Sequence, residues 1–287
     1  MPCTASYKTF ILFFFIWCGL IYSYAQTPLY KVELSDDLSS ILEKNSRIII
    51  SALNGKTSVD PYEYSDCESL ISVVVEEGIE RIGEYAFLGC KNLKTISLPS
   101  TLKEIGEGAF QECLSLDSLI IPERVQKIPP YLCAWDTLLK EVRLPERLKD
   151  MGNHAFAYCS SLNKINFPDS LIHIGSNAFS NCKSLKEVEI PDGMQELESY
   201  AFSGCEMLER AKLASNSNML GEMIFTGCNN LKEIISLSEV PPTFDCNTPL
   251  FDPLEIKLWQ QCKLILSPLA EKHYSRAPGW DLFFNSK

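Results

Sequence analysis

The chain has 287 residues, a formal net charge of −11 at neutral pH, and a hydrophobic fraction of 46%. Binding to nucleic acid or to an anionic lipid surface needs clustered basic residues, so an acidic chain of this kind excludes both as partners. The length is ample for a continuous hydrophobic core.

The N-terminal residues 1–25 have the pattern of a secretory signal peptide. Lys8 precedes an apolar run over residues 10–22, and Ser23 and Ala25 offer small side chains before a cleavage point after Ala25. The run is shorter than the roughly 20 residues that span a bilayer, and no second apolar run is longer, so no transmembrane segment is predicted. Lipidation at Cys18 is disfavoured by the bulky Trp17. We expect export, to the cell surface, the extracellular space or the periplasm.

Residues 26–59 are predicted to form an N-terminal cap. Ser35 can begin a short helix whose apolar side chains share one side. Residues 47–53 have the apolar, β-branched pattern of a strand that begins a stack.

A repeat of 23 residues organises residues 60–240. A cysteine position recurs at this spacing, as Cys67, Cys90, Cys113, Cys159, Cys182, Cys205 and Cys228, with Asp136 as the one break. A leucine follows three residues later, apolar residues follow at six and eight, a proline ends the apolar segment, and an Ala-Phe pair precedes the next cysteine position. A unit this short cannot bury its own apolar side and must stack on copies of itself.

The consensus I-x-L-P-x-x-L-x-x-I-G-x-x-A-F-x-x-C-x-x-L resembles the BspA-like leucine-rich repeats of bacterial surface and secreted proteins. The resemblance implies an α/β leucine-rich-repeat solenoid, a right-handed superhelix of short parallel strands joined by short helical or 3₁₀ turns. It also implies an exported protein that works in adhesion or protein binding, and it supplies no catalytic residues.

The cysteines are expected to stay reduced within the repeat. Stacked coils place successive thiols about 4.8 Å apart beside the phenylalanines, where free cysteine acts as a small apolar side chain. A disulfide would need converging side chains, and a metal would need tetrahedral ligands, which a linear stack does not give. Cys246 and Cys262 lie outside the repeat and are the better candidates for a disulfide.

Residues 241–287 are predicted to form a C-terminal cap. Residues 263–266 have the pattern of a strand, and Ser267 with Pro268 is a typical helix start for residues 269–274. Trp280 is expected to pack on the last coil.

The outward positions of the strands form columns along the stack. Two columns alternate in charge, which favours an ordinary stabilising role over a docking strip for a protein. A third column has no such alternation and would carry any specific recognition by the strand face; its candidate binding residues are Arg143, Asn166, Glu189 and Lys212.

The coil around Asp136 departs most from the consensus, because Leu132 and Cys133 replace the Ala-Phe pair. Tyr131, Trp135 and Tyr158 then form a candidate exposed aromatic patch, of the kind used in protein or glycan contacts. The favoured alternative is that Trp135 or Tyr131 turns inward to fill the volume of the missing phenylalanine.

Catalysis has little support in the sequence, since the chain has three histidines and none of the common nucleophile, zinc-protease or phosphate-loop motifs. Asp150 and His173, one repeat apart, could form a weak zinc cluster with His154, but a surface ion pair is the favoured interpretation. We therefore expect a monomeric, non-enzymatic binding module without a cofactor, with a protein partner or, as a further option, a glycan. A structural spacer in the cell envelope, without a specific ligand, is the alternative.

Overall fold

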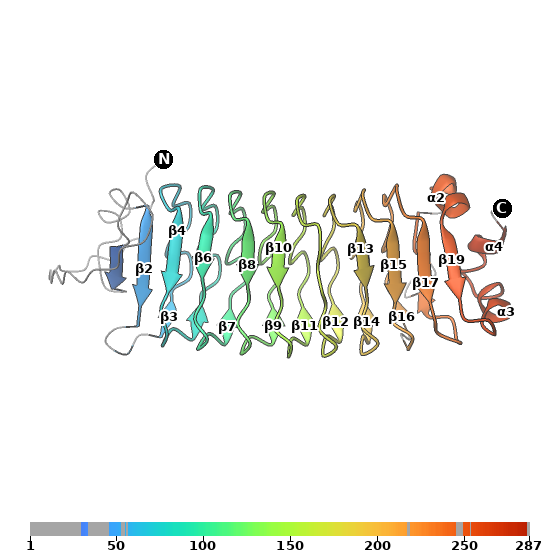
Figure 1. Ribbon diagram of the computed structural model, residues 1–287, viewed down its shortest axis with the longest axis horizontal. Helices are drawn as coiled ribbons and strands as arrows, with labels where there is room; N and C mark the ends of the chain where they lie inside the picture. The colour runs from blue at the N-terminus through green and yellow to red at the C-terminus, as the bar shows by residue number, and fades with distance from the viewer. Residues whose placement is uncertain are drawn as a thin grey trace.

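The computed structural model describes residues 30–33, 46–52, 55, 57–216, 219–244, 249–252 and 254–285. The predicted signal peptide, the helix expected after Ser35, and Cys246 lie outside these residues. The chain forms a parallel β-solenoid in which successive coils lie side by side along the long axis (Figure 1). This confirms the predicted leucine-rich-repeat architecture.

The first face of the solenoid is a row of short parallel strands that follow the apolar positions of the repeat. Within the repeat, strand residues pair with residues 23 positions on, as Ser118 does with Glu141. Between β10 and β13 only an isolated bridge is formed, which joins Glu141 to Lys164. The row begins with β1, one strand before the strand that was predicted at residues 47–53 as the start of the stack. Its members are β1 (Tyr30–Glu33), β2 (Arg47–Ser51), β4 (Ser72–Val75), β6 (Thr95–Ser97), β8 (Ser118–Ile120), β10 (Glu141–Arg143), β13 (Glu187–Glu189), β15 (Arg210–Leu213), β17 (Glu233–Ser236) and β19 (Lys263–Leu266).

A second face is made of two-residue strands that follow the corner of each coil, where the central coils carry a proline, from Pro99 to Pro191. One residue of each pair points outward and the other into the core, as Lys127 and Ile128 do. The strands are β3 (Ser58–Val59), β5 (Arg81–Ile82), β7 (Glu104–Ile105), β9 (Lys127–Ile128), β11 (Asp150–Met151), β12 (His173–Ile174), β14 (Glu196–Leu197), β16 (Met219–Leu220) and β18 (Thr243–Phe244).

Hydrogen-bonded turns, not helices, lead from the second face back to the first. Backbone bonds of the i to i+3 type occur there, for example from the N–H of Cys113 to the carbonyl of Phe110. Between them stand residues in the left-handed region, such as Tyr131 at φ 56° and Trp135 at φ 67°. Those residues aim their N–H groups at the next coil, so a regular helical turn does not propagate. The expected helical or 3₁₀ turns are therefore absent from the described coils up to residue 244.

The core is a ladder of aromatic rings from the Ala-Phe pairs. Successive rings stack with centroids 5.4 Å apart for Phe156 and Phe179, and 5.3 Å apart for Phe179 and Phe202. The rings of Phe87, Phe110, Phe156, Phe179, Phe202 and Phe225 are fully buried. In the coil around Asp136, which we call the aberrant coil, the buried side chains of Leu132 and Cys133 stand in place of the Ala-Phe pair.

The thiols of the repeat lie inside the core, as expected. The free and buried cysteines are Cys90, Cys113, Cys133, Cys159, Cys182, Cys205, Cys228 and Cys262. Two details differ from the prediction. Cys67, at the first cysteine position, is disulfide-bonded to a partner outside the described residues. The Cys246–Cys262 disulfide considered from the sequence is not formed, because Cys262 is a free thiol packed into the core.

The C-terminal residues close one end of the core. The helices α2 (Ile256–Gln261), α3 (Glu271–Tyr274) and α4 (Leu282–Asn285) gather there around β19, as Figure 1 shows. Trp280 is fully buried and donates its indole N–H to the carbonyl of Pro242 at 2.8 Å, so its predicted packing is confirmed. None of the helices in the described residues is long and apolar enough to cross a membrane.

Candidate functional site

The aromatic residues of the aberrant coil stay outside the core. Trp135 is 37% exposed and Tyr158 is 43% exposed. The prediction that Trp135 or Tyr131 turns inward is wrong, because Leu132 and Cys133 already occupy the interior of this coil. Both aromatic residues sit at left-handed backbone positions, which lie on the turn that projects toward solvent.

These residues form an ordered group with His154, which we call the aromatic cluster (Tyr131, Trp135, His154 and Tyr158). The Trp135 and Tyr158 rings stack with centroids 5.5 Å apart and planes 6° apart. The Tyr131 and His154 rings stack at 4.8 Å and 5°. Two rings from one coil thus lie against two from the next, and burial lowers the pKa of His154, which favours the neutral imidazole at neutral pH.

The candidate residues on the strand face lie in one column, apart from the aromatic cluster. Arg143, Asn166 and Glu189 are exposed, and Lys212 is partly exposed. Lys212 donates a hydrogen bond to the carboxylate of Glu189, so these two charges satisfy each other across neighbouring strands. Arg143 lies beside Ile120, whose side chain is 63% exposed. Near the middle of this column, Arg143 and Ile120 therefore present one basic and one apolar side chain to solvent.

Ion pairs also occur in the two alternating columns. Lys232 and Glu209 lie 2.9 Å apart, and Arg210 and Glu233 lie 3.4 Å apart. These contacts connect neighbouring coils, which supports the structural interpretation of the alternating charges.

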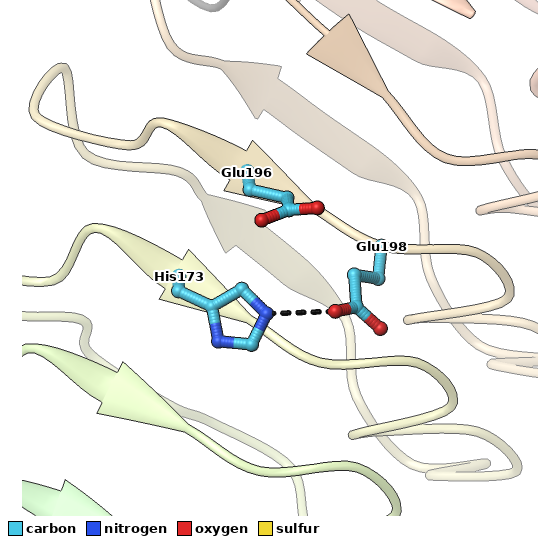
Figure 2. A group of neighbouring side chains, drawn as sticks. All are labelled: His173, Glu196 and Glu198. Atoms are coloured by element: carbon cyan, nitrogen blue, oxygen red, sulfur yellow. Dashed lines mark hydrogen bonds and ion pairs between the residues drawn. The ribbon is translucent and has the colours of Figure 1, made fainter. Parts of the chain in front are cut away.

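A cluster of ionisable side chains lies on the second face, in the column of β11, β12 and β14 (Figure 2). His173 Nδ1 lies 2.7 Å from Asp150 Oδ1, and His173 Nε2 lies 2.9 Å from Glu198 Oε1. The ligand atoms of His173, Glu196 and Glu198 all lie within 4.8 Å of one another. We call these three residues the His173 cluster.

The sequence analysis found only part of this arrangement. It placed Asp150 next to His173, and the structure does bring them together. It also offered His154, which instead stacks on Tyr131 in the aromatic cluster. It missed Glu196, although 196 follows 173 by one repeat, and it missed Glu198, which stands where most coils have glycine after the second-face strand.

The environment of His173 favours its charged form. Burial alone would lower the pKa of His173, but its hydrogen bonds to Asp150 and Glu198 outweigh burial and raise the pKa above its ordinary value. Burial of Glu198 is likewise outweighed by hydrogen bonds from Ser176 and His173, so the pKa of Glu198 is lowered. The side chains of His173 and Glu198 are 26% and 30% exposed, so solvent reaches both.

The parallel coils, the 23-residue register and the buried leucine and phenylalanine columns define a leucine-rich-repeat solenoid. The family model described as a BspA type leucine-rich repeat region matches the chain in six copies, over residues 57–171 and 149–241. The chain belongs to this family.

Two solved structures illustrate the similarity. A leucine-rich repeat protein of T. pallidum is 28% identical, with 66% of this chain and 78% of that chain covered and a TM-score of 0.48. A leucine-rich repeat protein from Bacteroides ovatus is 26% identical, with 76% of this chain and 68% of that chain covered and a TM-score of 0.46. No curated protein matches the chain.

Proposed function

We propose that the protein is an exported, non-enzymatic binding module that recognises a protein partner through the aromatic cluster. The observation that carries this proposal is the exposure of stacked rings at the one coil where the cysteine position is lost. Exposed tryptophan and tyrosine bring a large contact area at a small entropic cost, because their rings have few rotamers to lose. The stack also holds these rings in place before a partner arrives.

The strand-face column, which lies apart from the aromatic cluster, is a second surface that can add polar recognition. Arg143 follows the turn of Trp135 directly along the chain, and its guanidinium can hydrogen-bond a partner's carboxylate or carbonyl groups. Lys212 and Glu189 are engaged with each other, so we assign them a smaller share of recognition.

Export rests on the N-terminal pattern of residues 1–25. Secretion by the producing organism, followed by N-terminal sequencing, tests it: a mature chain that begins at Gln26 is expected. Recovery from the cytoplasm of a chain that still carries residues 1–25 would contradict export.

Binding is tested with labelled protein on intact cells of the producing organism and of its neighbours or host. The double variant Trp135→Ala, Tyr158→Ala should lose saturable binding by at least tenfold, as expected for truncated anchor residues. Tyr62→Ala is the matched control, because Tyr62 is 52% exposed and stacks on Tyr85 at 5.2 Å, in the column of Tyr131 and three coils before Tyr131.

The outcomes separate three roles. A protein partner is supported if the double variant loses binding and if protease treatment of the cells abolishes binding of the wild type. A glycan partner is identified instead if binding of the wild type resists protease treatment of the cells and is lost after glycosidase treatment. Absence of saturable binding, or equal binding of the double variant, overturns the proposal and favours the spacer role.

A further inference from the structure

We propose that His173, Glu196 and Glu198 form a binding site for one divalent transition-metal ion of the Zn²⁺ type. One imidazole nitrogen and two carboxylates are a common ligand set for zinc, with a fourth position left to water. The site lies on the second face of the solenoid, and Ser176, which contacts Glu198, accepts the backbone N–H of His154 in the neighbouring aromatic cluster at 2.9 Å.

The ligand atoms are already close enough for one ion. Metal–ligand bonds of about 2.1 Å put neighbouring ligand atoms of a tetrahedral site about 3.4 Å apart. His173 Nε2 and Glu198 Oε1 lie 2.9 Å apart, and Glu196 brings an oxygen within 4.8 Å of both. An ion therefore needs only small side-chain movements, and Figure 2 shows all three groups converging from adjacent coils.

Neighbouring residues orient the ligands as they do in metal proteins. A ligating histidine usually donates its second ring N–H to a carboxylate, which fixes the ring and its tautomer. Asp150 accepts that bond from His173 Nδ1 at 2.7 Å, and Nε2 faces the two glutamates, so an ion that binds there displaces the Nε2 proton. Ser176 donates its N–H and its hydroxyl to Glu198 Oε2, at 2.9 and 2.6 Å, and so leaves Oε1 directed at the imidazole.

The charges around the site favour a cation. Within the described part of the chain, the Glu196 carboxylate makes no ion pair or side-chain hydrogen bond. Asp150, Glu196 and Glu198 surround one imidazole, and Lys127 is the cation that lies closest in the same column, 3.5 Å from Asp150. The carboxylates of Glu196 and Glu198 repel each other, and an ion between them removes this repulsion.

Glu198 also stands at a sterically demanding position of the repeat. The corresponding residues in the adjacent coils are Gly175 and Gly221. A Cβ on Gly221 would meet the backbone of Ser199 at 2.2 Å, and one on Gly175 would meet the backbone of Asn153 at 2.8 Å. Glu198 therefore stands in a column where the neighbouring coils leave no space for a Cβ, and its carboxylate completes the ligand set.

The test is calorimetric titration of the metal-free full chain with ZnCl₂, with Co²⁺ absorption as a second readout. We expect the wild type to bind one equivalent of Zn²⁺. The variants His173→Ala, Glu196→Gln and Glu198→Gln should each lose this binding. Asp150→Asn should weaken the same equivalent by about 10- to 100-fold, the usual effect of removing the partner of a ligating histidine. Glu198→Gly, which restores the repeat residue, provides a second version of the ligand loss.

His273→Ala is the matched control, since it removes an exposed imidazole on α3 and leaves the His173 cluster intact. Circular dichroism of each metal-free variant shows whether the fold is kept. The proposal is overturned if the folded ligand variants bind the same equivalent as the wild type, or if the wild type takes up no Zn²⁺ at millimolar concentration. In that case the cluster serves as a histidine–carboxylate ion pair alone.

Discussion

The thiol of Cys182 donates a hydrogen bond to the backbone carbonyl of Phe156, 26 residues earlier, with Sγ 3.2 Å from the oxygen. The same carbonyl accepts the N–H of Cys159 in its own coil at 3.2 Å. The relationship recurs from coil to coil, in Cys90 with Tyr64, Cys113 with Phe87, Cys159 with Cys133, Cys205 with Phe179 and Cys228 with Phe202. Each of these six cysteines therefore fills space and also ties its coil to the preceding one.

The first prediction concerns the reactivity of these thiols. Burial raises the pKa of Cys90 and of Cys262 to about 12, and it raises the pKa of Cys182 well above its ordinary value. Because the thiolate is the reactive form, the described free thiols should resist iodoacetamide in the native protein at pH 8 and react fully in guanidinium. Peptide mass spectrometry after alkylation measures this. Native labelling of Cys182 would contradict the buried ladder.

The second prediction separates the two kinds of aromatic stack. Phe156→Ala should lower the free energy of unfolding by about 3–5 kcal/mol, because it leaves a cavity in the ring ladder. Trp135→Ala should lower it by about 1 kcal/mol or less, because that side chain is outside the core. Urea unfolding of both variants is the measurement. A large loss from Trp135→Ala would mean that the aromatic cluster maintains the fold.

The third prediction concerns Asp136, a fully buried carboxyl group at a cysteine position. Its Oδ1 accepts the N–H of Cys113 at 2.8 Å, and its Oδ2 has no hydrogen-bond partner within the described structure. Asp136→Cys restores the repeat and should stabilise the protein at neutral pH by about 1–3 kcal/mol, the usual cost of an unsatisfied buried polar group.

The stabilisation should depend on pH in a defined direction. Burial raises the pKa of Asp136 well above its ordinary value, so the unfolded chain releases this proton at a lower pH than the folded chain does. The wild type therefore loses stability as pH rises from about 4 toward the folded pKa, and Asp136→Cys does not. Thermal unfolding of both proteins at pH 5 and pH 7.5 should show a larger difference at pH 7.5. A difference that grows toward acid pH would contradict this assignment.

The fourth prediction addresses the strand-face column. A double-mutant cycle with Glu189→Gln and Lys212→Met should give a coupling of less than about 1 kcal/mol, because the pair is exposed to solvent. The coupling should disappear in 1 M salt, where charges are screened within a few ångströms. Chemical denaturation with urea, which adds no ionic strength, is the appropriate measurement. A coupling that persists in 1 M salt would show that hydrogen-bond geometry, not charge, holds the pair.

The sequence predicted the features that the repeat determines. A fixed spacing places the leucines, the Ala-Phe pairs and the thiols in columns, and all of these columns are buried as expected. The strand at β19 and the burial of Trp280 followed from local turn and cap residues. These predictions need only the register and the preference of apolar side chains for the interior.

Features that depend on side-chain direction between columns could not be predicted in the same way. The outward position of Trp135 depends on whether Leu132 and Cys133 fill their coil, which is a matter of packing volume. The contact between His173 and Glu198 joins residues 25 positions apart, in two different columns. A search for positions where the consensus glycine is replaced would have drawn attention to Glu198.

The strand hydrogen bonds run from coil to coil, parallel to the long axis of the solenoid (Figure 1). A pulling force applied to the two ends of the solenoid would therefore act along these hydrogen bonds and break them one coil after another. Each detached coil would release 23 residues, a length of roughly 80 Å when extended. Under tension at a surface, such a chain would lengthen in discrete steps and absorb a sudden load before its far end is pulled away.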